Sequence, residues 1–102
     1  MPNVLTNYTT SSVGTSPVTL YTVPASTTGT IVGLQVANTS ASQIEIDVQA
    51  AGVYLVKGAA IPAKSALSLL DGKIVVKTAQ TVVITSNTAT SADAILSVLE
   101  QS

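Results

Sequence analysis

The chain contains no histidine, cysteine, arginine, tryptophan or phenylalanine among its 102 residues. Histidine is the side chain that most often performs general acid–base catalysis near neutral pH. Cysteine supplies thiolate nucleophiles, disulfides and thiolate metal ligands. These absences remove most of the usual chemistry of active sites and zinc sites. We therefore expect a protein that is not an enzyme, with no catalytic residue, no metal site and no cofactor.

Charge is scarce as well. Four lysines and five acidic residues give a net charge of −1, and charged residues form 9% of the chain, compared with about 25% in an average soluble protein. The lysines are dispersed, at positions 57, 64, 73 and 77. Nucleic-acid binding relies on clustered cations, and binding of single strands also relies on stacking aromatics. We therefore expect no nucleic-acid partner.

Long apolar runs are absent too. No stretch approaches the roughly 20 apolar residues of a membrane helix, and the first residues lack the basic and apolar regions of a secretion signal. We expect no membrane partner and synthesis in a cytoplasm. Yet 46% of the residues are hydrophobic, and a monomer of this size exposes only about 5,000 Å². We therefore expect contacts between copies to bury part of the surface, as in a homotrimer.

The sequence does contain apolar and polar side chains that alternate with a period of two. In the segment 43–49, Ile44, Ile46 and Val48 alternate with polar residues, which is typical of a half-buried strand. Further strands are predicted at 18–23, 30–38, 53–57, 66–70, 73–77, 81–86 and 94–100. Residues 89–101 also suit a helix, but their Ile and Val content favours a strand. Asp71-Gly72, between two apolar runs, predicts a hairpin.

These strands predict an all-β fold: an antiparallel two-sheet sandwich, jelly-roll-like, with about eight strands. A barrel is the second choice. Residues 17–102 form the predicted β-sandwich domain. Residues 1–16 are more polar, and we interpret them as an N-terminal arm or an edge strand. Their spaced apolar residues, Val4, Leu5, Tyr8 and Val13, are the predicted partner-binding residues.

Two pairs of residues offer weak chemical alternatives. Glu45 and Asp47 lie two positions apart on one face of a strand, where they either pair as acids or bind a cation, or are simply solvated. Lys64 and Ser65 match a Ser–Lys pair of hydrolases, but adjacent residues of a strand point to opposite faces. In both cases the ordinary structural role is the better interpretation.

Three tyrosines are the only aromatic residues: Tyr8, Tyr21 and Tyr54. An exposed aromatic ring is a common platform for sugars, so each is a candidate in a lectin-like site. Tyr21 and Tyr54 lie within predicted strands, where a tyrosine more often joins the core to the surface.

Several segments resemble small all-β structural proteins of tailed bacteriophages. They are Thr19-Leu20-Tyr21-Thr22-Val23-Pro24, the run 30–39 from Thr30 to Thr39, the run 54–62 from Tyr54 to Pro62, Gly72-Lys73-Ile74-Val75-Val76, and Leu96-Ser97-Val98-Leu99-Glu100. The likeness spans about residues 17–100. It implies a virion component, either a capsid decoration (cement) protein or a fibre-attachment domain, commonly trimeric, and it transfers no catalytic residue.

We therefore expect a non-enzymatic virion structural protein, made in the host cytoplasm, that stabilises the phage head by bridging capsid subunits. Its expected partners are copies of itself and the major capsid protein or another virion protein. The alternative is a tail or head fibre module that binds receptors, with lectin-like glycan binding.

Overall fold

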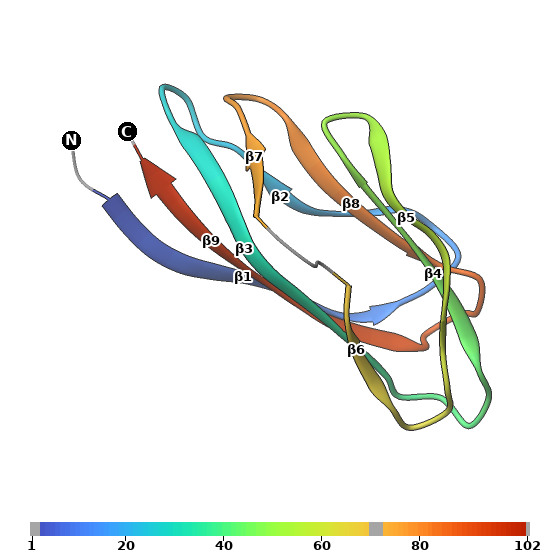
Figure 1. Cartoon of the computed structure of the whole chain (residues 1–102). Helices are drawn as coiled ribbons and strands as arrows, with labels where there is room; N and C mark the ends of the chain where they lie inside the picture. The colour runs from blue at the N-terminus through green and yellow to red at the C-terminus, as the bar shows by residue number, and fades with distance from the viewer. Residues whose placement is uncertain (1–2, 70–72, 102) are drawn as a thin grey trace.

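The computed structural model describes residues 3–69 and 73–101. Within these ranges the chain forms nine β-strands and no helix (Figure 1). Valine, isoleucine and threonine are frequent in the strands, because branched side chains pack well on a pleated surface. The strands are β1 (Asn3–Val13), β2 (Val18–Thr22), β3 (Thr28–Asn38), β4 (Ile44–Ala50), β5 (Val53–Ile61), β6 (Ala66–Ser68), β7 (Ile74–Val76), β8 (Thr81–Ser86) and β9 (Ala92–Gln101).

The strands form two antiparallel sheets. Sheet A has the order β1-β9-β3, and β6 and β7 both pair with the far side of β3. Sheet B has the order β2-β8-β4-β5. Figure 1 shows the two sheets packed face to face. The predicted antiparallel two-sheet sandwich is therefore confirmed.

The strand pairs are nested around the turn between β4 and β5. The innermost pair is β4 with β5, followed outward by β3 with β6 and β7, β2 with β8, and β1 with β9. Successive pairs alternate between sheet B and sheet A. The sandwich is thus one long antiparallel hairpin rolled on itself, and Asn3 lies opposite Gln101 at its open end.

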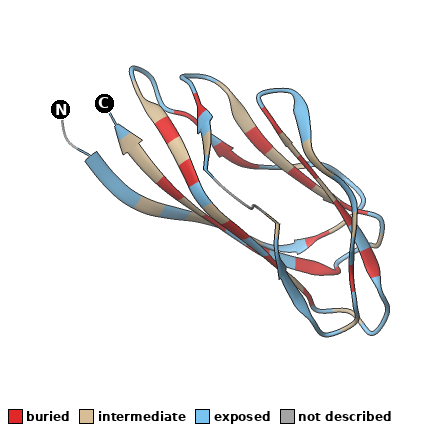
Figure 2. Ribbon diagram, viewed as in Figure 1, coloured by how far each residue is buried: buried red, intermediate tan, exposed pale blue. Residues whose placement is uncertain are grey.

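The core consists of alternate side chains from both sheets. Ile31, Leu34 and Leu96 from sheet A and Ile46 and Ile84 from sheet B are all buried, and Figure 2 shows the corresponding alternation along the strands. The period-two pattern of the sequence therefore predicts the inward faces well. Burying a side chain of this size contributes about 1.5–3 kcal/mol.

The turn between β4 and β5 is a two-residue hairpin at Ala51-Gly52. Both residues have positive φ, 53° and 81°, which is the requirement of the type I′ turn that best matches the twist of paired strands. The Ala51 amide also donates a hydrogen bond to the Thr81 carbonyl at 2.9 Å. This bond holds an alanine in a conformation that glycine or asparagine adopts more readily.

The region around residue 71 differs from the prediction. Asp71 and Gly72 lie outside the described residues, but the strands on either side, β6 and β7, both run antiparallel to β3. Two strands that share a direction do not form a hairpin, so the hairpin prediction is wrong. The segment 89–101, which suits either a helix or a strand in the sequence, forms β9 over most of its length.

Buried polar groups close the end of the sandwich opposite the termini. Asn38 is buried, and its amide nitrogen donates to the carbonyls of Ser42, Ile61 and Pro62 at 2.8–3.1 Å. Its amide oxygen accepts bonds from the backbone N–H and the hydroxyl of Ser40 at 2.9 and 2.7 Å. One side chain thus joins the β3–β4 loop to the end of β5.

Candidate interaction surfaces

The four predicted partner-binding residues lie on β1, the edge strand of sheet A, but in different surroundings. Val4 and Leu5 are exposed, to 48% and 73%. Tyr8 is half-buried and packs against the core. Val13 is fully buried in the core, so it is not available to a partner of the folded protein. Of the four, Val4 and Leu5 therefore offer a free apolar surface.

Tyr8 and Tyr21 share one acceptor between the two sheets. Their phenol hydroxyls donate to the same Glu100 carboxylate oxygen at 2.8 and 2.7 Å, and their ring centroids lie 4.5 Å apart. Burial, followed by the hydrogen bond to Glu100 and its charge, raises the pKa of both phenols. A Cβ at Gly29 would lie 2.9 Å from the Tyr21 hydroxyl, so the glycine makes room for this cluster.

The outer side of sheet A carries exposed apolar side chains. Leu5 pairs with Leu99, Leu99 pairs with Thr30, and Thr30 pairs with Val75, so one cross-strand row crosses the sheet. Leu5 and Val75 are exposed, to 73% and 57%. Two further exposed apolar residues, Val32 and Ile95, belong to the same sheet. The sheet-A face is defined here by Leu5, Val32, Val75, Ile95 and Leu99.

The sheet-A face is hollowed at one end. A shallow depression of about 750 Å³ is lined by residues of β1, β3 and β9, among them Thr9, Gln35, Asp93 and Ile95. The lining mixes hydroxyl, amide and carboxylate groups with an exposed isoleucine. Such a surface has both hydrogen-bonding groups and apolar area to offer a protein partner.

The outer side of sheet B has a different character. Lys57 lies 3.3 Å from an Asp47 carboxylate oxygen and 4.6 Å from the centre of the Tyr54 ring. The other Asp47 oxygen accepts the Gly58 amide at 2.7 Å. The hydrogen bond from Lys57 to Asp47 is the main cause of a raised pKa of the lysine. A smaller hollow of about 220 Å³ lies beside Tyr54 and is partly lined by Gln49.

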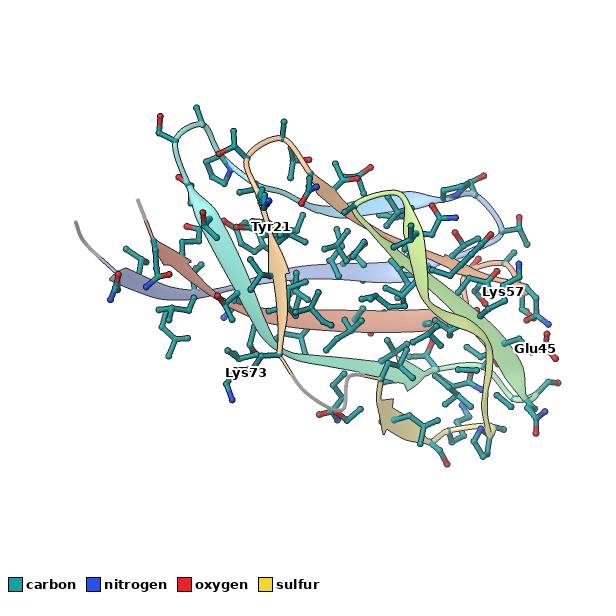
Figure 3. The ribbon with its side chains drawn as sticks, turned by 45° about the horizontal axis from the view of Figure 1, so that its top comes forward. Tyr21, Glu45, Lys57 and Lys73 are labelled. Atoms are coloured by element: carbon teal, nitrogen blue, oxygen red, sulfur yellow. The ribbon has the colours of Figure 1, made fainter. Side chains whose placement is uncertain are left out.

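Of the two acids considered in the sequence, Asp47 makes structural contacts. Asp47 binds Lys57 and the Gly58 amide, and Glu45 is exposed on β4. Figure 3 shows Glu45 and Lys57 toward the opposite end of the molecule from Tyr21. Within residues 3–69 and 73–101, no three acidic side chains gather as a cation site would require. These contacts favour the structural interpretation of Asp47.

The Ser–Lys interpretation also lacks supporting geometry. Lys64 has a positive φ of 61° in the turn before β6. The Ser65 hydroxyl donates to the Ala63 carbonyl at 3.5 Å. A nucleophile requires its hydroxyl to be directed at a base, and the contact of Ser65 is instead the local bond of a turn.

Two residues on which the structure depends are not predicted from the sequence. Asn38 and Glu100 both hold groups that lie far away along the chain, and only their positions at strand ends distinguish them from other polar residues. Asn38 ends β3 inside a loop-rich segment, which is a weak signal of a cap. Glu100 has no local signal, because Tyr8 and Tyr21 are 92 and 79 residues distant from it.

A scan against protein-family models found no match to this chain, and neither did searches of curated proteins and of solved structures. Among the described residues, no helix has the length and apolar character needed to cross a membrane.

Proposed function

We propose that this chain is a non-enzymatic virion structural protein, a capsid decoration protein that binds copies of itself and the major capsid protein. The resemblance of its segments to structural proteins of tailed phages motivates the proposal. The observation that carries it is the sheet-A face, on which Leu5 and Val75 are more than half exposed. Contiguous exposed apolar area on a small protein marks a surface that binds another protein.

We also propose that the sandwich is a jelly roll. A jelly roll places its strands in two sheets through two Greek keys, and it is frequent in viral capsid proteins and lectins. The nested pairs, which alternate between sheet B and sheet A outward from β4 and β5, support this topology. β6 and β7 then count as two parts of one strand, because both run antiparallel to β3.

The size of the sheet-A face fits a protein partner. β9 has 10 residues, which span about 33 Å at ~3.3 Å per residue. Three or four strands spaced by ~4.8 Å give a width of roughly 15–19 Å. The resulting plane of roughly 500–600 Å² approaches the ~800 Å² per partner of a standard interface, whose accessible area exceeds its planar area.

Co-sedimentation with capsids tests this function. The chain is expressed with the major capsid protein of the phage that encodes it, and the assembled capsids are pelleted. We expect the chain in the pellet at a fixed ratio to the capsid protein. The variant Val75→Asp with Ile95→Asp is expected to stay in the supernatant. Val53→Asp is the matched control, because Val53 is exposed to 63% on the other sheet. A wild-type chain that stays in the supernatant would overturn the proposal.

A receptor-binding fibre module is the second candidate, and Tyr54 favours it. This ring is exposed to 52% on β5, beside the hollow that Asp47, Gln49 and Thr85 help to line. An aromatic ring next to carboxylate, amide and hydroxyl groups suits a sugar, which presents apolar C–H faces and hydroxyls. Lys57 lies over the same ring, so a sugar would use the opposite face of the ring or displace the lysine.

A glycan array separates the two candidates. The fibre function predicts binding to a defined glycan, with the signal lost in Tyr54→Ala and kept in Tyr8→Phe. The decoration function predicts no glycan signal and capsid co-sedimentation. The two variants differ because Tyr54 is exposed, whereas the Tyr8 hydroxyl is bound to Glu100.

A further inference from the structure

The free edges of the two sheets are not equivalent. Sheet B ends at β2 and β5, and sheet A ends at β1 and at the β6 and β7 side of β3. An edge strand presents unpaired N–H and C=O groups that invite pairing with another chain. Proteins block such edges with short strands, bulges, prolines and lysines. Three of these four edges carry such features.

The edge at β5 is blocked by bulges and charge. Its pairing with β4 shifts register twice, between Ile46 and Val48 and again between Val48 and Gln49. Gly58 has a positive φ of 69°, and Lys57 is exposed on the strand. Each bulge bends the strand and interrupts the row of groups that a partner would bind.

The other edge of sheet B is blocked by its length and its flanks. β2 has 5 residues and a register shift between Thr19 and Tyr21. Pro17 and Pro24 stand on either side of it, and proline cannot donate a backbone hydrogen bond. β2 therefore offers a partner strand at most a few regularly spaced backbone N–H and C=O groups.

The described part of the sheet-A edge at β6 and β7 consists of two short strands. Both strands have 3 residues. Lys73 and Lys77 flank β7 and are exposed, and Figure 3 shows the Lys73 side chain directed away from the ribbon. A lysine on an edge opposes pairing, because burying its charge in a new interface is costly.

The edge at β1 has none of these features along most of its length. It pairs with β9 without interruption from Asn3 to Thr10, and its register shift falls between Thr10 and Val13. Residues 3–13 contain no charged residue, no proline and no glycine. Alternate residues of such a strand direct both backbone groups away from β9. β1 is therefore the long, regular and uncharged edge of this sandwich.

We infer that β1 is the seam between two copies of this chain, which pair antiparallel through β1 and join their A sheets into one continuous sheet. This inference rests on the self-assembly in the proposed function. Pairing requires a free edge on both sides, and a second copy supplies one of the same length and character, its own β1. The other three edges of a copy are blocked, so β1 pairs with the β1 of the second copy. The strand also carries no charge that would be repelled by its own copy.

The symmetry of this seam has a definite consequence. Antiparallel pairing within one sheet places a two-fold axis perpendicular to the sheet, at one residue of β1. That residue lies opposite itself, with about 4.5–5.5 Å between the two Cα atoms. The seam produces dimers, so a trimer of the kind expected from the sequence would need a different surface.

Disulfide cross-linking tests the seam directly, because the wild-type chain has no cysteine. Single cysteines are placed at five positions of β1 and oxidised: Val4→Cys, Leu5→Cys, Thr6→Cys, Asn7→Cys and Thr9→Cys. Disulfides join Cα atoms 4.4–6.8 Å apart. A residue two positions from the axis lies roughly 13 Å from its own copy along the strand, at ~3.3 Å per residue. We expect the dimer yield to be highest at one position and to fall steeply on both sides.

Val53→Cys is the matched control, because this residue is exposed to 63% on the blocked edge β5. We expect it to give little dimer. Equal yields at all β1 positions, or a yield at residue 53 equal to the best β1 position, would overturn the seam. A wild-type mass in solution that corresponds to a monomer would overturn it as well.

A charge variant gives a second, independent test. Asn7→Lys with Thr9→Lys adds two lysines to exposed positions of β1, and we expect a monomer with little change in melting temperature. The control, Thr19→Lys with Thr22→Lys, changes exposed positions of the blocked edge β2 and is expected to remain dimeric. A β1 variant that stays dimeric would contradict the seam.

Cross-linking tests the seam, and capsid sedimentation tests the decoration function, so the two proposals can fail independently. Dimers linked at β1 that do not bind capsids would leave the seam intact and overturn the decoration function. Capsid binding by a chain that gives no β1 cross-links would overturn the seam and leave the decoration function intact.

Discussion

Buried polar side chains stabilise this sandwich at positions where the backbone leaves its regular ladder. Asn38 uses both ends of its amide, on three carbonyls and on Ser40. Ser86 and Ser91 share a hydrogen bond of 2.7 Å, and the Ser91 hydroxyl also lies 2.7 Å from the Thr88 carbonyl. Loops at this end are thus tied by short side chains, because a buried carbonyl without a partner costs about 1–3 kcal/mol.

Asn38→Ala should lower the free energy of unfolding by about 3 kcal/mol, because it removes the donor to the buried Ile61 carbonyl and to the part-buried carbonyls of Ser42 and Pro62. Asn87→Ala is the matched control and should cost less than about 1 kcal/mol, because Asn87 is exposed and its amide oxygen accepts only the Glu45 backbone amide and the neighbouring Thr88 hydroxyl. Urea denaturation of both variants measures the difference. Equal losses in the two variants would show that the buried amide has no special role.

The tyrosine cluster makes stability depend on pH at the alkaline end. The folded state raises the pKa of Tyr21, chiefly through burial and then through Glu100, above the unfolded value of about 10. The folded state therefore holds the phenol proton more tightly than the unfolded chain. The contribution of protonated Tyr21 to the free energy of unfolding is complete below pH ~10 and is lost as the pH rises through the folded pKa of Tyr21.

Tyr21→Phe should lower the free energy of unfolding by about 2 kcal/mol at pH 8, since it removes a hydrogen bond to a charged acceptor. The variant should also show a shallower loss of stability between pH 9 and pH 11 than the wild type. Denaturation curves across this range give both quantities. Thr22→Val, which changes an exposed position of the same strand and no titratable group, should keep the wild-type slope. Parallel slopes for Tyr21→Phe and the wild type would contradict the prediction.

At the level of strands, β1 contains residues that look alike in the sequence but differ in burial. Val4 and Val13 are both valines in the largely polar segment 3–13, yet Val13 is fully buried and Val4 is 48% exposed. Val4 and Val13 lie opposite Glu100 and Ala92, which share one face of β9 because they are an even number of residues apart. The two valines therefore differ by their position along the strand: Val4 lies near the open end and Val13 lies in the core at the other end. The strand is therefore anchored at one end and open at the other.

Val13→Ala should cost about 2 kcal/mol of unfolding free energy, because it empties space in a packed core. Val4→Ala should cost less than about 0.5 kcal/mol, as expected of a surface change. Thermal denaturation of the pair tests this contrast. If Val4→Ala proved as costly as Val13→Ala, the described burial of β1 would be wrong.

Strands with strict alternation could be predicted from the sequence, as β4 illustrates. Ile44, Ile46 and Val48 are all buried as the pattern predicts. The prediction failed around residue 71, where Asp-Gly between apolar runs resembles a hairpin. There the pairing of both flanking strands with β3 prevailed over the local turn signal. Tertiary pairing of this kind leaves no local trace in the sequence.

For the whole molecule, the nested pairing makes most contacts non-local. β1 and β9 pair across nearly the entire chain, from Asn3 with Gln101 to Val13 with Ala92. Loop closure must precede such contacts, so folds dominated by them form in roughly milliseconds to seconds. The two-sheet class could be predicted from strand number and spacing. The partner of each strand could not, because strands of similar composition are interchangeable in the sequence.

A circular permutant should fold faster than the wild type. Joining the ends by a short Gly-Ser linker and opening the chain between Ala25 and Ser26 turns β1 and β9 into a local hairpin. The shorter loop lowers the closure cost, by the logarithmic dependence on loop length, and we expect refolding to accelerate by about ten-fold. Stopped-flow tyrosine fluorescence measures both chains. A permutant that refolds no faster would show that β1–β9 pairing follows the rate-limiting step.

The bulged strand β5 limits how far copies of this chain assemble, as a monofunctional unit does in a polymerisation. A unit with one reactive end terminates growth at the first addition, whereas a unit with two reactive ends forms chains. With its bulges and Lys57 in place, β5 leaves each copy monofunctional through β1, and growth ends at the dimer. Straightening β5 and removing Lys57 would make each copy bifunctional. The same sandwich would then supply the repeating unit of a filament.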